Sequence, residues 1–572
     1  MRTPKTLYPH ERIIYKPELS ACPHCGGALV LCNYLSWDKT VQTLDAVLSI
    51  ASRPGHCTTP GCRGQTRRVL SAAGQQLALP GSTYGNDVIV RIGWQRQVRQ
   101  DIYREIHADL TAHIQISESQ VRYLYQHVYL PLLACHERQQ VGRLTQAVAD
   151  YGGLLIALDG LAPAGGEPQL WFIRELTTGL TLRSGWLSRF DQTTFEAFLT
   201  PLTELPGPIL AVLSDKQTGL LPAVASVLPS ARHHLCHTHY LRNLAEPWAA
   251  QDSAFNVALR KAVRQTVGEL LRTEQVASTA PTNVLTVTGM LPTALATPAA
   301  ADTDAPQPPI SPAAPPADAV VTQLCHHTRY LLTLKGRPPF RLAGMETYQR
   351  LHQVVRLSTD LLGTHYDPRL AQLQRGLQTA LTPLHAQYQD LCQGATWLQG
   401  MAHILRPVED HPRTGTQVAQ QLRAYVDDLL RYPTMAPHLA AFRQHLDTVS
   451  RSYWPGLFHC YDIAQLPRTN NALESHFRDT QRRLLRTTGQ RNLTRRTLQR
   501  TGAWELLPPF TSQNAARTAL QHLCPTLLAQ EQRRLRDHLA RFRLHARSDQ
   551  RIQAQFAGLR QQWRAIAAVS TG

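Results

Sequence analysis

The sequence predicts a mixed α/β domain that is interrupted by an all-helical insertion, preceded by a small cysteine-rich module and followed by a basic helical region. Two short apolar runs, at 154–158 and 208–214, each end in an aspartate, which is typical of buried strands in one sheet. Residues 320–455 instead carry apolar side chains at helical spacing. Two cysteine pairs lie on Gly/Pro-rich turns within residues 20–65.

The composition indicates a polyanionic partner. The chain has 572 residues, 43% of them apolar, and a formal net charge of +18. Nucleic acid is the first expectation for such a charge, and a basic surface without that role is the alternative. No apolar run is long enough to span a membrane, and the first residues lack the apolar core of a secretory signal. We therefore expect a cytoplasmic, nucleoid-associated protein.

The cysteine-rich module, at 1–75, is expected to be a zinc ribbon. Cys22 and Cys25 form one pair, and Cys57 and Cys62 form a second pair with a wider spacing. Tight turns that carry Gly and Pro let two such pairs complete a tetrahedral site, so one structural Zn²⁺ is predicted. An odd total of eleven cysteines also favours metal ligation over disulfides. Unrelated free thiols are the alternative, and three further residues are spare ligand candidates: His24, Cys32 and His56.

Residues 76–145 are expected to form a DNA-binding helix–turn–helix. The segments that begin at Asp101 and Gln115 have helical character, and a serine, Ser117 or Ser119, can cap the second helix. The second helix would then present polar side chains to a DNA groove. The candidates are Gln120, Arg122, Tyr123 and Gln126. A plain helical hairpin is the alternative, because this motif is short and common.

The α/β region at 150–250 has the order βββαβαβ. After the first apolar run come two strand-like segments, 169–176 and 180–187, separated by a turn that contains Gly179. A helix follows with Asp191 as its cap, then the second apolar run, a helix at 220–228 and a short strand at 232–236. This pattern predicts a sheet with a meander of three strands at its start.

The remainder of the chain divides into an insertion and two further segments. The helical insertion is expected at 251–460, and an Ala/Thr/Pro-rich stretch at 276–320 within it is expected to be a disordered linker. Residues 461–505 would complete the α/β domain, and residues 506–572 would form a basic helical C-terminal region.

Three acids are candidate metal ligands. Asp159 and Asp215 each end a predicted strand, so both carboxylates should lie at one edge of the sheet. Carboxylate oxygens bind hard cations, and two ions about 4 Å apart can serve phosphodiester displacement. Glu474 is the best third acid, in the first turn of a helix capped by Asn470 or Asn471. The pattern predicts two Mg²⁺ or Mn²⁺ ions, with Glu346 and Glu505 as rival third acids.

Arginines follow Glu474 at helical spacing. Arg478, Arg482 and Arg486 share one face of the same helix, which suits phosphate contacts beside a metal ligand.

The order of these motifs resembles the DDE transposases, which have an RNase H-like catalytic core. The resemblance rests on the βββαβαβ order, on Asp159 and Asp215, and on Thr469-Asn-Asn-Ala-Leu-Glu474. Cys236-His-Thr-His239 is similar to the C-x-x-H signature of the Mutator-type branch. The cysteine module followed by a helix–turn–helix is similar to bacterial insertion-sequence transposases. The long Ala/Pro linker departs from the family pattern.

The resemblance implies a fold and an activity. It implies an RNase H-like core interrupted by a helical insertion, with Asp159, Asp215 and Glu474 as catalytic acids. It implies cleavage of double-stranded DNA at terminal inverted repeats, strand transfer into target DNA, and a homodimer or higher oligomer that joins two ends. Cys236 and His239 would pack in the core or support the site, with a second metal site as the less favoured reading.

Other functions and simpler roles stay open from the sequence. A domesticated transposase could act as a DNA-binding regulator, and a nuclease on the same core would lack strand transfer. An RNA-processing RNase H relative fits the N-terminal modules less well. Asp159 could instead be a turn residue, Asp215 a helix cap, and Glu474 a first-turn acid favoured by the helix dipole.

Overall fold

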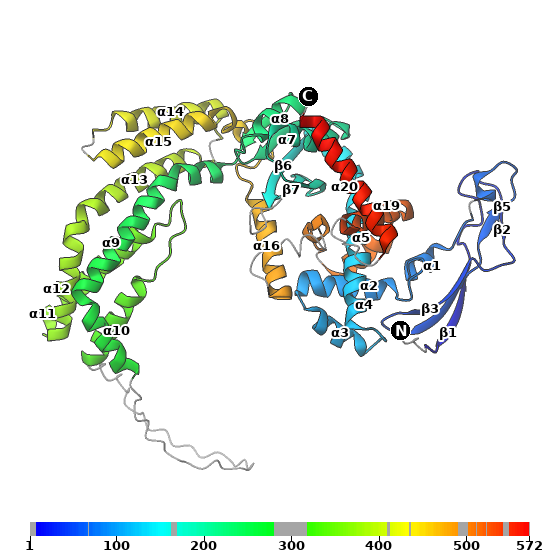
Figure 1. Ribbon diagram of the computed structural model, residues 1–572, viewed down its shortest axis with the longest axis horizontal. Coiled ribbons are helices and arrows are strands. Elements are labelled where there is room, and N and C mark those ends of the chain that lie inside the picture. The colour runs from blue at the N-terminus through cyan, green and yellow to red at the C-terminus, as the bar shows by residue number, and fades with distance from the viewer. Residues whose placement is uncertain are drawn as a thin grey trace, which may run out of the picture. The chain divides into compact units, whose positions relative to one another are not determined.

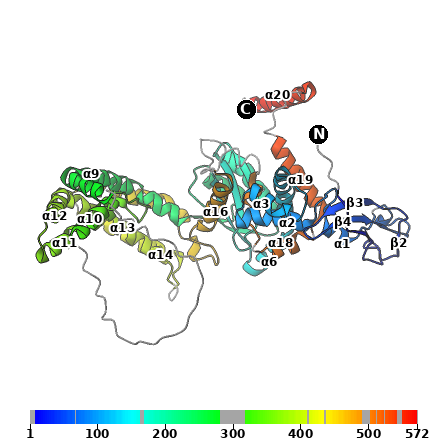
Figure 2. The ribbon, with the colours of Figure 1, turned by 90° about the horizontal axis from the view of Figure 1, so that it is seen from below.

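The computed structural model describes residues 7–66, 68–161, 169–279, 317–408, 412–433, 436–489, 502–510, 512–521, 523–540 and 548–570. The chain forms two compact units (Figures 1 and 2). The core unit comprises Met1–His234 and Ile463–Gly572, and the insertion unit comprises Leu235–Asp462. Within the described residues, none of the helices combines the length and the apolar character that crossing a membrane requires.

The N-terminal module contains two small sheets. Strands β1 (Glu11–Tyr15), β4 (Val47–Ser52) and β3 (Trp37–Gln42) form one sheet in that order, with β1 parallel to β4. Strands β2 (Leu29–Leu31) and β5 (Gly55–Cys57) form an antiparallel pair, followed by a short 3₁₀ helix, η1 (Arg63–Gln65).

Helix α1 (Ala72–Leu77) ends the module and is fixed by two side chains at its start. Ser71 accepts a hydrogen bond from the Gly74 amide, and Glu18 accepts from the Ala72 amide at 2.8 Å. These bonds satisfy amides that have no partner within the helix.

A helical region follows the module. It contains α2 (Asn86–Trp94), α3 (Tyr103–Thr111), α4 (Glu118–Leu124), α5 (Leu130–Gln139) and α6 (Gly142–Tyr151), with π-helical turns η2 (Gln95–Arg99) and η3 (Tyr125–Tyr129). The predicted cap is Ser117, whose hydroxyl accepts from the Gln120 amide at 3.3 Å.

The C-terminal segments of the core unit pack against this helical region. They are η8 (Gly502–Leu506), α18 (Gln513–Gln521) and α19 (Pro525–Ala540), which contact α2, α5 and η3 and are followed in the chain by α20 (Asp549–Ser570). Leu507, Ala516 and Leu528 from these segments share one apolar core with Ile92 and Leu133. This shared apolar core therefore joins the helical region to the C-terminal segments.

The central sheet has the strand order β10-β9-β6-β7-β8. Its strands are β6 (Leu154–Leu161), β7 (Gln169–Glu175), β8 (Thr181–Leu187), β9 (Ile209–Ser214) and β10 (Arg232–Leu235). Strands β6, β7 and β8 form an antiparallel meander, while β9 runs parallel to β6. The predicted βββαβαβ succession is confirmed, because α7 (Gln192–Leu199), the 3₁₀ helix η4 (Thr200–Glu204) and α8 (Leu220–Val227) connect the last strands.

The two faces of the sheet are covered by different segments. Trp171 and Ile173 pack on one face in a core with Phe195 and Val224 from α7 and α8. On the other face, the Phe172 ring lies 6.2 Å from the ring of Phe477 in α16 (Asn471–Thr488). Asp191 caps α7 as predicted, by accepting from the Thr194 amide at 2.9 Å.

The insertion unit is helical throughout its described residues. It consists of α9 (His237–Thr279), α10 (Ala317–Leu331), α11 (Ala343–Thr364), α12 (Pro368–Leu381), α13 (His385–Ile404), α14 (Gly415–Arg431) and α15 (Pro437–Tyr453), with 3₁₀ turns η5 (Thr382–Leu384), η6 (Trp454–Gly456) and η7 (His459–Tyr461). Trp248 of α9 is fully buried and stacks on Phe442 at 4.4 Å. Asp252 accepts from the Gly344 and Met345 amides, which caps α11 with a buried carboxylate.

The structure corrects two predicted boundaries. Helical structure in the insertion begins at His237 rather than at residue 251, because α9 starts directly after β10. The predicted linker at 276–320 is helical at both ends, since α9 extends to Thr279 and α10 begins at Ala317. The rest of that stretch, residues 280–316, lies outside the described residues.

Candidate functional site

Asp159 lies in β6, and Asp215 directly follows the adjacent parallel strand β9 in the core unit. The register pairs Ala157 of β6 with Leu213 of β9, so the same register continued for two residues would set Asp159 level with Asp215. Neighbouring strands are about 4.8 Å apart, so the two backbones are close at this edge. Both aspartates are half-buried. This geometry suits carboxylates that share metal ions.

Asp159 lies inside β6 and not in a turn. It pairs with Phe172 and the following Gly160 pairs with Trp171. A Cβ atom at Gly160 would lie 2.8 Å from the indole of Trp171, so the close approach of that ring requires glycine here. The Asp159 carboxylate accepts from the Gly160 amide at 2.8 Å. The turn alternative for Asp159 is therefore wrong.

Asp215 directly follows β9 and does not cap the next helix, because Gly219 is the N-cap of α8. Its backbone is fixed by the preceding residue. The Ser214 hydroxyl donates to the Asp215 carbonyl at 2.7 Å, and its oxygen lies 2.7 Å from Nε2 of His233. Sequence reasoning missed Ser214 and His233, because only the pairing of β9 with β10 brings them together.

Helix α16 brings Glu474 to the face of the sheet on which Asp159 lies. The Asn470 side chain donates to the Leu158 carbonyl at 3.1 Å, one residue before Asp159. The Glu474 amide donates to the Asn470 carbonyl at 3.0 Å, so Glu474 lies one turn further along. Asn470 occupies the predicted N-cap position, but its side chain holds the helix to β6 instead of capping it.

The arginines of α16 divide between the two faces of the helix. Arg478, Arg482 and Arg486 are exposed, as the predicted phosphate-binding face requires. Arg483 is instead buried, with 6% of its side chain exposed, and pairs with Glu505 at 3.5 Å. The Tyr125 hydroxyl donates to the same carboxylate at 3.0 Å. Glu505 therefore joins α16 to the helical region that contains Tyr125.

The other rival acid lies in the insertion unit. Glu346 is in the first turn of α11 and forms an ion pair with Arg341 at 3.1 Å. His476, two residues after Glu474, is half-buried near Phe172 of the sheet. Burial first, and then the charge of Arg174, lower the pKa of His476 to about 4, so its ring is neutral at pH 7.

The four predicted cysteines form one cluster. The sulfur atoms of Cys22, Cys25, Cys57 and Cys62 all lie within 4.8 Å of one another. The Cys22–Cys62 and Cys25–Cys57 sulfur distances are 3.8 Å and 3.4 Å. Zn–S bonds of about 2.3 Å in a tetrahedron give sulfur separations of this order. The cluster could therefore hold a zinc ion.

Hydrogen bonds favour a thiolate at Cys25, whereas the effect of the Gly64 amide at Cys62 is outweighed by burial and the other three cysteines, which raise the pKa of Cys62 to about 12. The amide two residues after each cysteine donates to its sulfur. The donors are His24 to Cys22 at 3.4 Å, Gly27 to Cys25, Thr59 to Cys57 at 3.4 Å, and Gly64 to Cys62 at 3.3 Å. The Gly27 amide and the Thr59 hydroxyl lower the pKa of Cys25 to about 6. Such bonds stabilise the charged form that binds metal.

The spare ligand candidates do not join this cluster. Cys32 is buried, and its sulfur lies 3.5 Å from Nδ1 of His56, so these two form a separate pair. A Cβ atom at Gly64 would lie 2.7 Å from the Cys22 sulfur, so the turn after Cys62 needs glycine at this position.

Three of the predicted groove-reading residues, Gln120, Arg122 and Tyr123, are on α4, and Gln126 lies in the π-helical turn η3 that follows. Arg122 is exposed, pairs with Glu118 at 3.6 Å and lies over the Tyr103 ring at 5.2 Å. Tyr123 is 52% exposed and stacks on His127 at 4.8 Å. A cavity of about 790 Å³ separates Gln120 and Tyr123 from α19, so the C-terminal segment forms the opposite wall of the space in front of this helix.

The C-x-x-H segment lies at the start of the insertion unit. Cys236 is fully buried, and its carbonyl accepts from the Tyr240 amide at 3.0 Å. His237, which the sequence did not single out, lies 2.7 Å from the Leu457 carbonyl and 3.8 Å from the Cys460 sulfur. His239 is half-buried. A packing role for Cys236 agrees with its burial.

Comparisons with known proteins give matches among solved structures alone. No family model matches the chain, and no curated protein matches it. Among solved structures, the chain is similar to the Drosophila P element transposase strand transfer complex, with 10% sequence identity and a TM-score of 0.28. The match covers 81% of this chain and 95% of that one.

Proposed function

We propose that this protein is a DNA transposase of the DDE type, with an RNase H-like core and with Asp159, Asp215 and Glu474 as its catalytic acids. The observation that carries the proposal is the parallel register of β6 and β9, which would set the two aspartates level if it continued two residues beyond the pair of Ala157 and Leu213. The bond from Asn470 to the Leu158 carbonyl supports Glu474 as the third acid. The strand order β10-β9-β6-β7-β8 supports the core type.

The three acids suit two divalent metal ions. All are half-buried, and carboxylate oxygens are the ligands that Mg²⁺ and Mn²⁺ prefer. When bound, the ions would supply charge stabilisation for both the attacking and the leaving oxygen of an in-line displacement. The protein side chains would hold the reacting phosphate against this edge of the sheet.

The chemistry would proceed in two displacements. Water attacks the phosphorus at the end of the element, the bond from phosphorus to the 3′ oxygen breaks, and that oxygen takes up a proton. The freed 3′ hydroxyl then attacks a phosphodiester of the target, so one ester bond forms while another breaks. No covalent intermediate with the protein is needed, and no energy source is consumed.

DNA would be held by surfaces on several elements of the core unit. The face of α4 with Gln120, Arg122 and Tyr123 would read the terminal inverted repeats, together with the cysteine module. Arg478, Arg482 and Arg486 would contact phosphates next to the acids. Because two ends must be joined, we infer a homodimer or a higher oligomer.

The decisive experiment measures DNA cleavage by Glu474→Gln. The change keeps the size of the side chain but removes the charge that a hard cation prefers. The variant should bind end DNA as tightly as the wild-type protein, and neither nick nor join it in Mg²⁺. Glu346→Gln is the matched control, because Glu346 is in the insertion unit and pairs only on the surface with Arg341. This control should cut normally.

The other outcomes separate the alternatives. A wild-type protein that binds ends specifically but never cuts them would favour the DNA-binding regulator. Cutting without joining would favour a nuclease. Cleavage retained in Glu474→Gln would remove Glu474 from the site.

A further inference from the structure

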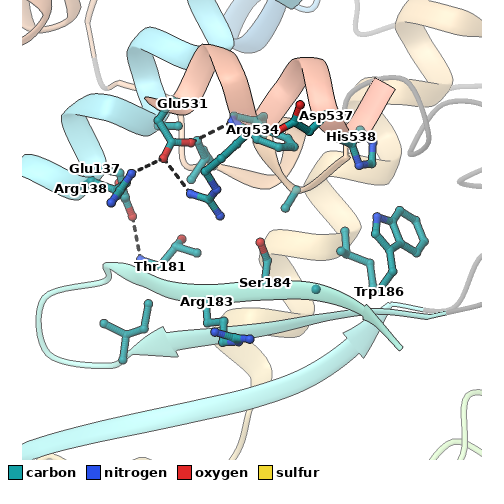
Figure 3. A pocket seen from close by; sticks show the side chains of 17 residues that line it. Glu137, Arg138, Thr181, Arg183, Ser184, Trp186, Glu531, Arg534, Asp537 and His538 are labelled. Atoms are coloured by element: carbon teal, nitrogen blue, oxygen red, sulfur yellow. Dashed lines mark hydrogen bonds and ion pairs between the residues drawn. The ribbon is translucent and has the colours of Figure 1, made fainter. Parts of the chain in front are cut away.

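A cavity of about 410 Å³ lies between the edge strand β8 and helix α19 in the core unit (Figure 3). Strand β8 forms its floor, α19 its roof, and α5 and η8 its walls. Figure 3 shows Ser184 pointing from the strand toward α19. Arg183 points to the other face of the sheet, where its guanidinium lies 5.2 Å from the Phe198 ring. The function proposed above does not use this cavity.

The cavity opens on the sheet face that carries Asp159. Directly paired residues of neighbouring strands point to the same face, and Asp159 pairs with Phe172, which pairs with Ser184. Two strand spacings separate Asp159 from Ser184, which is about 10 Å. That is roughly three steps along a DNA strand at 3.4 Å each. A strand cut at Asp159 could therefore reach the cavity.

Two arginines at the cavity are held in place by one buried acid. Glu531 is 1% exposed, and its Oε1 lies 2.7 Å from both Arg138 and Arg534. The arginine side chains are 42% and 58% exposed, respectively. Each guanidinium has five donors, so one carboxylate leaves most of them for another anion. Glu531 thus fixes two partly exposed guanidinium groups whose remaining donors could bind a phosphate.

Aromatic and polar groups complete the cavity. Trp186 and Trp504 line it and are half-buried, which leaves ring surface for stacking. Trp504 is oriented by its indole N–H, which donates to Oε2 of Glu531 at 3.3 Å. Ser184 and Asp537 supply hydrogen-bonding groups that could pair with the edge of a base.

We propose that this cavity binds one unstacked nucleotide of a DNA strand next to the cleavage site. Arg138 and Arg534 would bind its phosphate, and Trp186 and Trp504 would stack on its base. The volume is that of a small-molecule site, which suits one nucleotide and excludes a duplex. The inference rests on the proposed function, because the DNA strand is the expected occupant only if Asp159 belongs to the cutting site.

The test compares two DNA probes bound to the full-length protein without divalent metal. One probe is a blunt duplex, and the other is the same duplex with a short single-stranded extension. Arg534→Ala and Trp186→Ala should weaken binding of the extended probe about 10-fold, the scale of one stacked base. Ser184→Trp fills the cavity and should do the same. Binding of the blunt duplex should be unchanged.

Arg533→Ala is the matched control, because Arg533 is exposed on the same helix and does not line the cavity. Equal weakening on both probes, or none on either, would overturn the proposal. A free nucleoside monophosphate that quenches tryptophan fluorescence but leaves the extended probe bound would overturn the DNA strand as the occupant of the cavity. Because no cleavage is measured, these outcomes stay distinct from failure of Glu474→Gln.

Discussion

Glu505→Gln is expected to destabilise the core unit while leaving DNA cleavage intact. Glu505 lies in η8, receives the Tyr125 hydroxyl at 3.0 Å and pairs with Arg483 at 3.5 Å. Its side chain is 4% exposed, so the charge is almost fully removed from water. The substitution keeps a hydrogen-bond acceptor for Tyr125 but leaves the guanidinium of Arg483 without a counter-charge. The cost is therefore mainly electrostatic.

The size of the effect follows from burial. Removing one partner of a buried ion pair costs about 3–5 kcal/mol, because the remaining charge is uncompensated. Arg483 also donates to the Glu505 carbonyl, which the substitution retains. We therefore expect the lower end of that range, about 3 kcal/mol. The same change at the exposed pair formed by Glu346 and Arg341 should cost at most about 1 kcal/mol.

Urea unfolding followed by tryptophan fluorescence measures this difference, since Trp504 precedes Glu505 in η8. The double variant Arg483→Met with Glu505→Gln should recover part of the loss, because no buried charge is then left alone. A Glu505→Gln protein as stable as the wild type would refute the electrostatic argument. A folded Glu505→Gln protein that binds DNA but does not cut it would return Glu505 to the list of candidate third acids.

Three further results are expected. Cys57→Ser should lose about one zinc per chain, and its N-terminal module should unfold, whereas Cys32→Ser should keep its metal. Elemental analysis measures the zinc, and proteolysis measures the folding of the module. A Cys57→Ser protein that keeps its zinc would contradict the assignment. Arg478→Ala should weaken DNA binding uniformly and lower the slope of log affinity against log salt by about 1; an unchanged slope would remove Arg478 from the phosphate contacts. Partial burial opposes ionisation of Glu18, but hydrogen bonds from the Ser71 hydroxyl and nearby amides outweigh it and hold its pKa at about 2. The stabilisation by Glu18 is thus present above its ordinary pKa of 4.5 and is lost as the pH falls toward 2, so Glu18→Gln should remove this part of the pH dependence of unfolding. Identical pH dependence of unfolding for the wild-type protein and Glu18→Gln would contradict this role of Glu18.

Local patterns in the sequence predicted the parts of the molecule that depend on local chemistry. The apolar runs before Asp159 and Asp215 are strands because they are buried on both faces of the sheet. Cys22, Cys25, Cys57 and Cys62 cluster because each pair lies on a tight turn. The cap by Ser117 follows from hydrogen bonding within a single turn of helix.

Features that depend on distant contacts were not predictable. Asparagine is a common N-cap residue, yet the Asn470 side chain donates a hydrogen bond to the Leu158 carbonyl, because α16 packs on the sheet. Glu505 looked like a possible metal ligand, and only its contacts with Arg483 and Tyr125 identify it as structural. The cavity under α19 needs segments from both ends of the core unit, and no spacing in the sequence relates them.

The division of the core unit into two stretches of chain has a consequence for biosynthesis. Asp159 and Asp215 leave the ribosome before the insertion unit, whereas Glu474 and α16 follow it. At roughly 5–20 residues per second, translation of the intervening segment takes on the order of tens of seconds. During that interval a nascent chain that already carries the cysteine module and α4 has only two of the three proposed catalytic acids. The proposed three-acid site can therefore assemble only after the insertion unit has been translated.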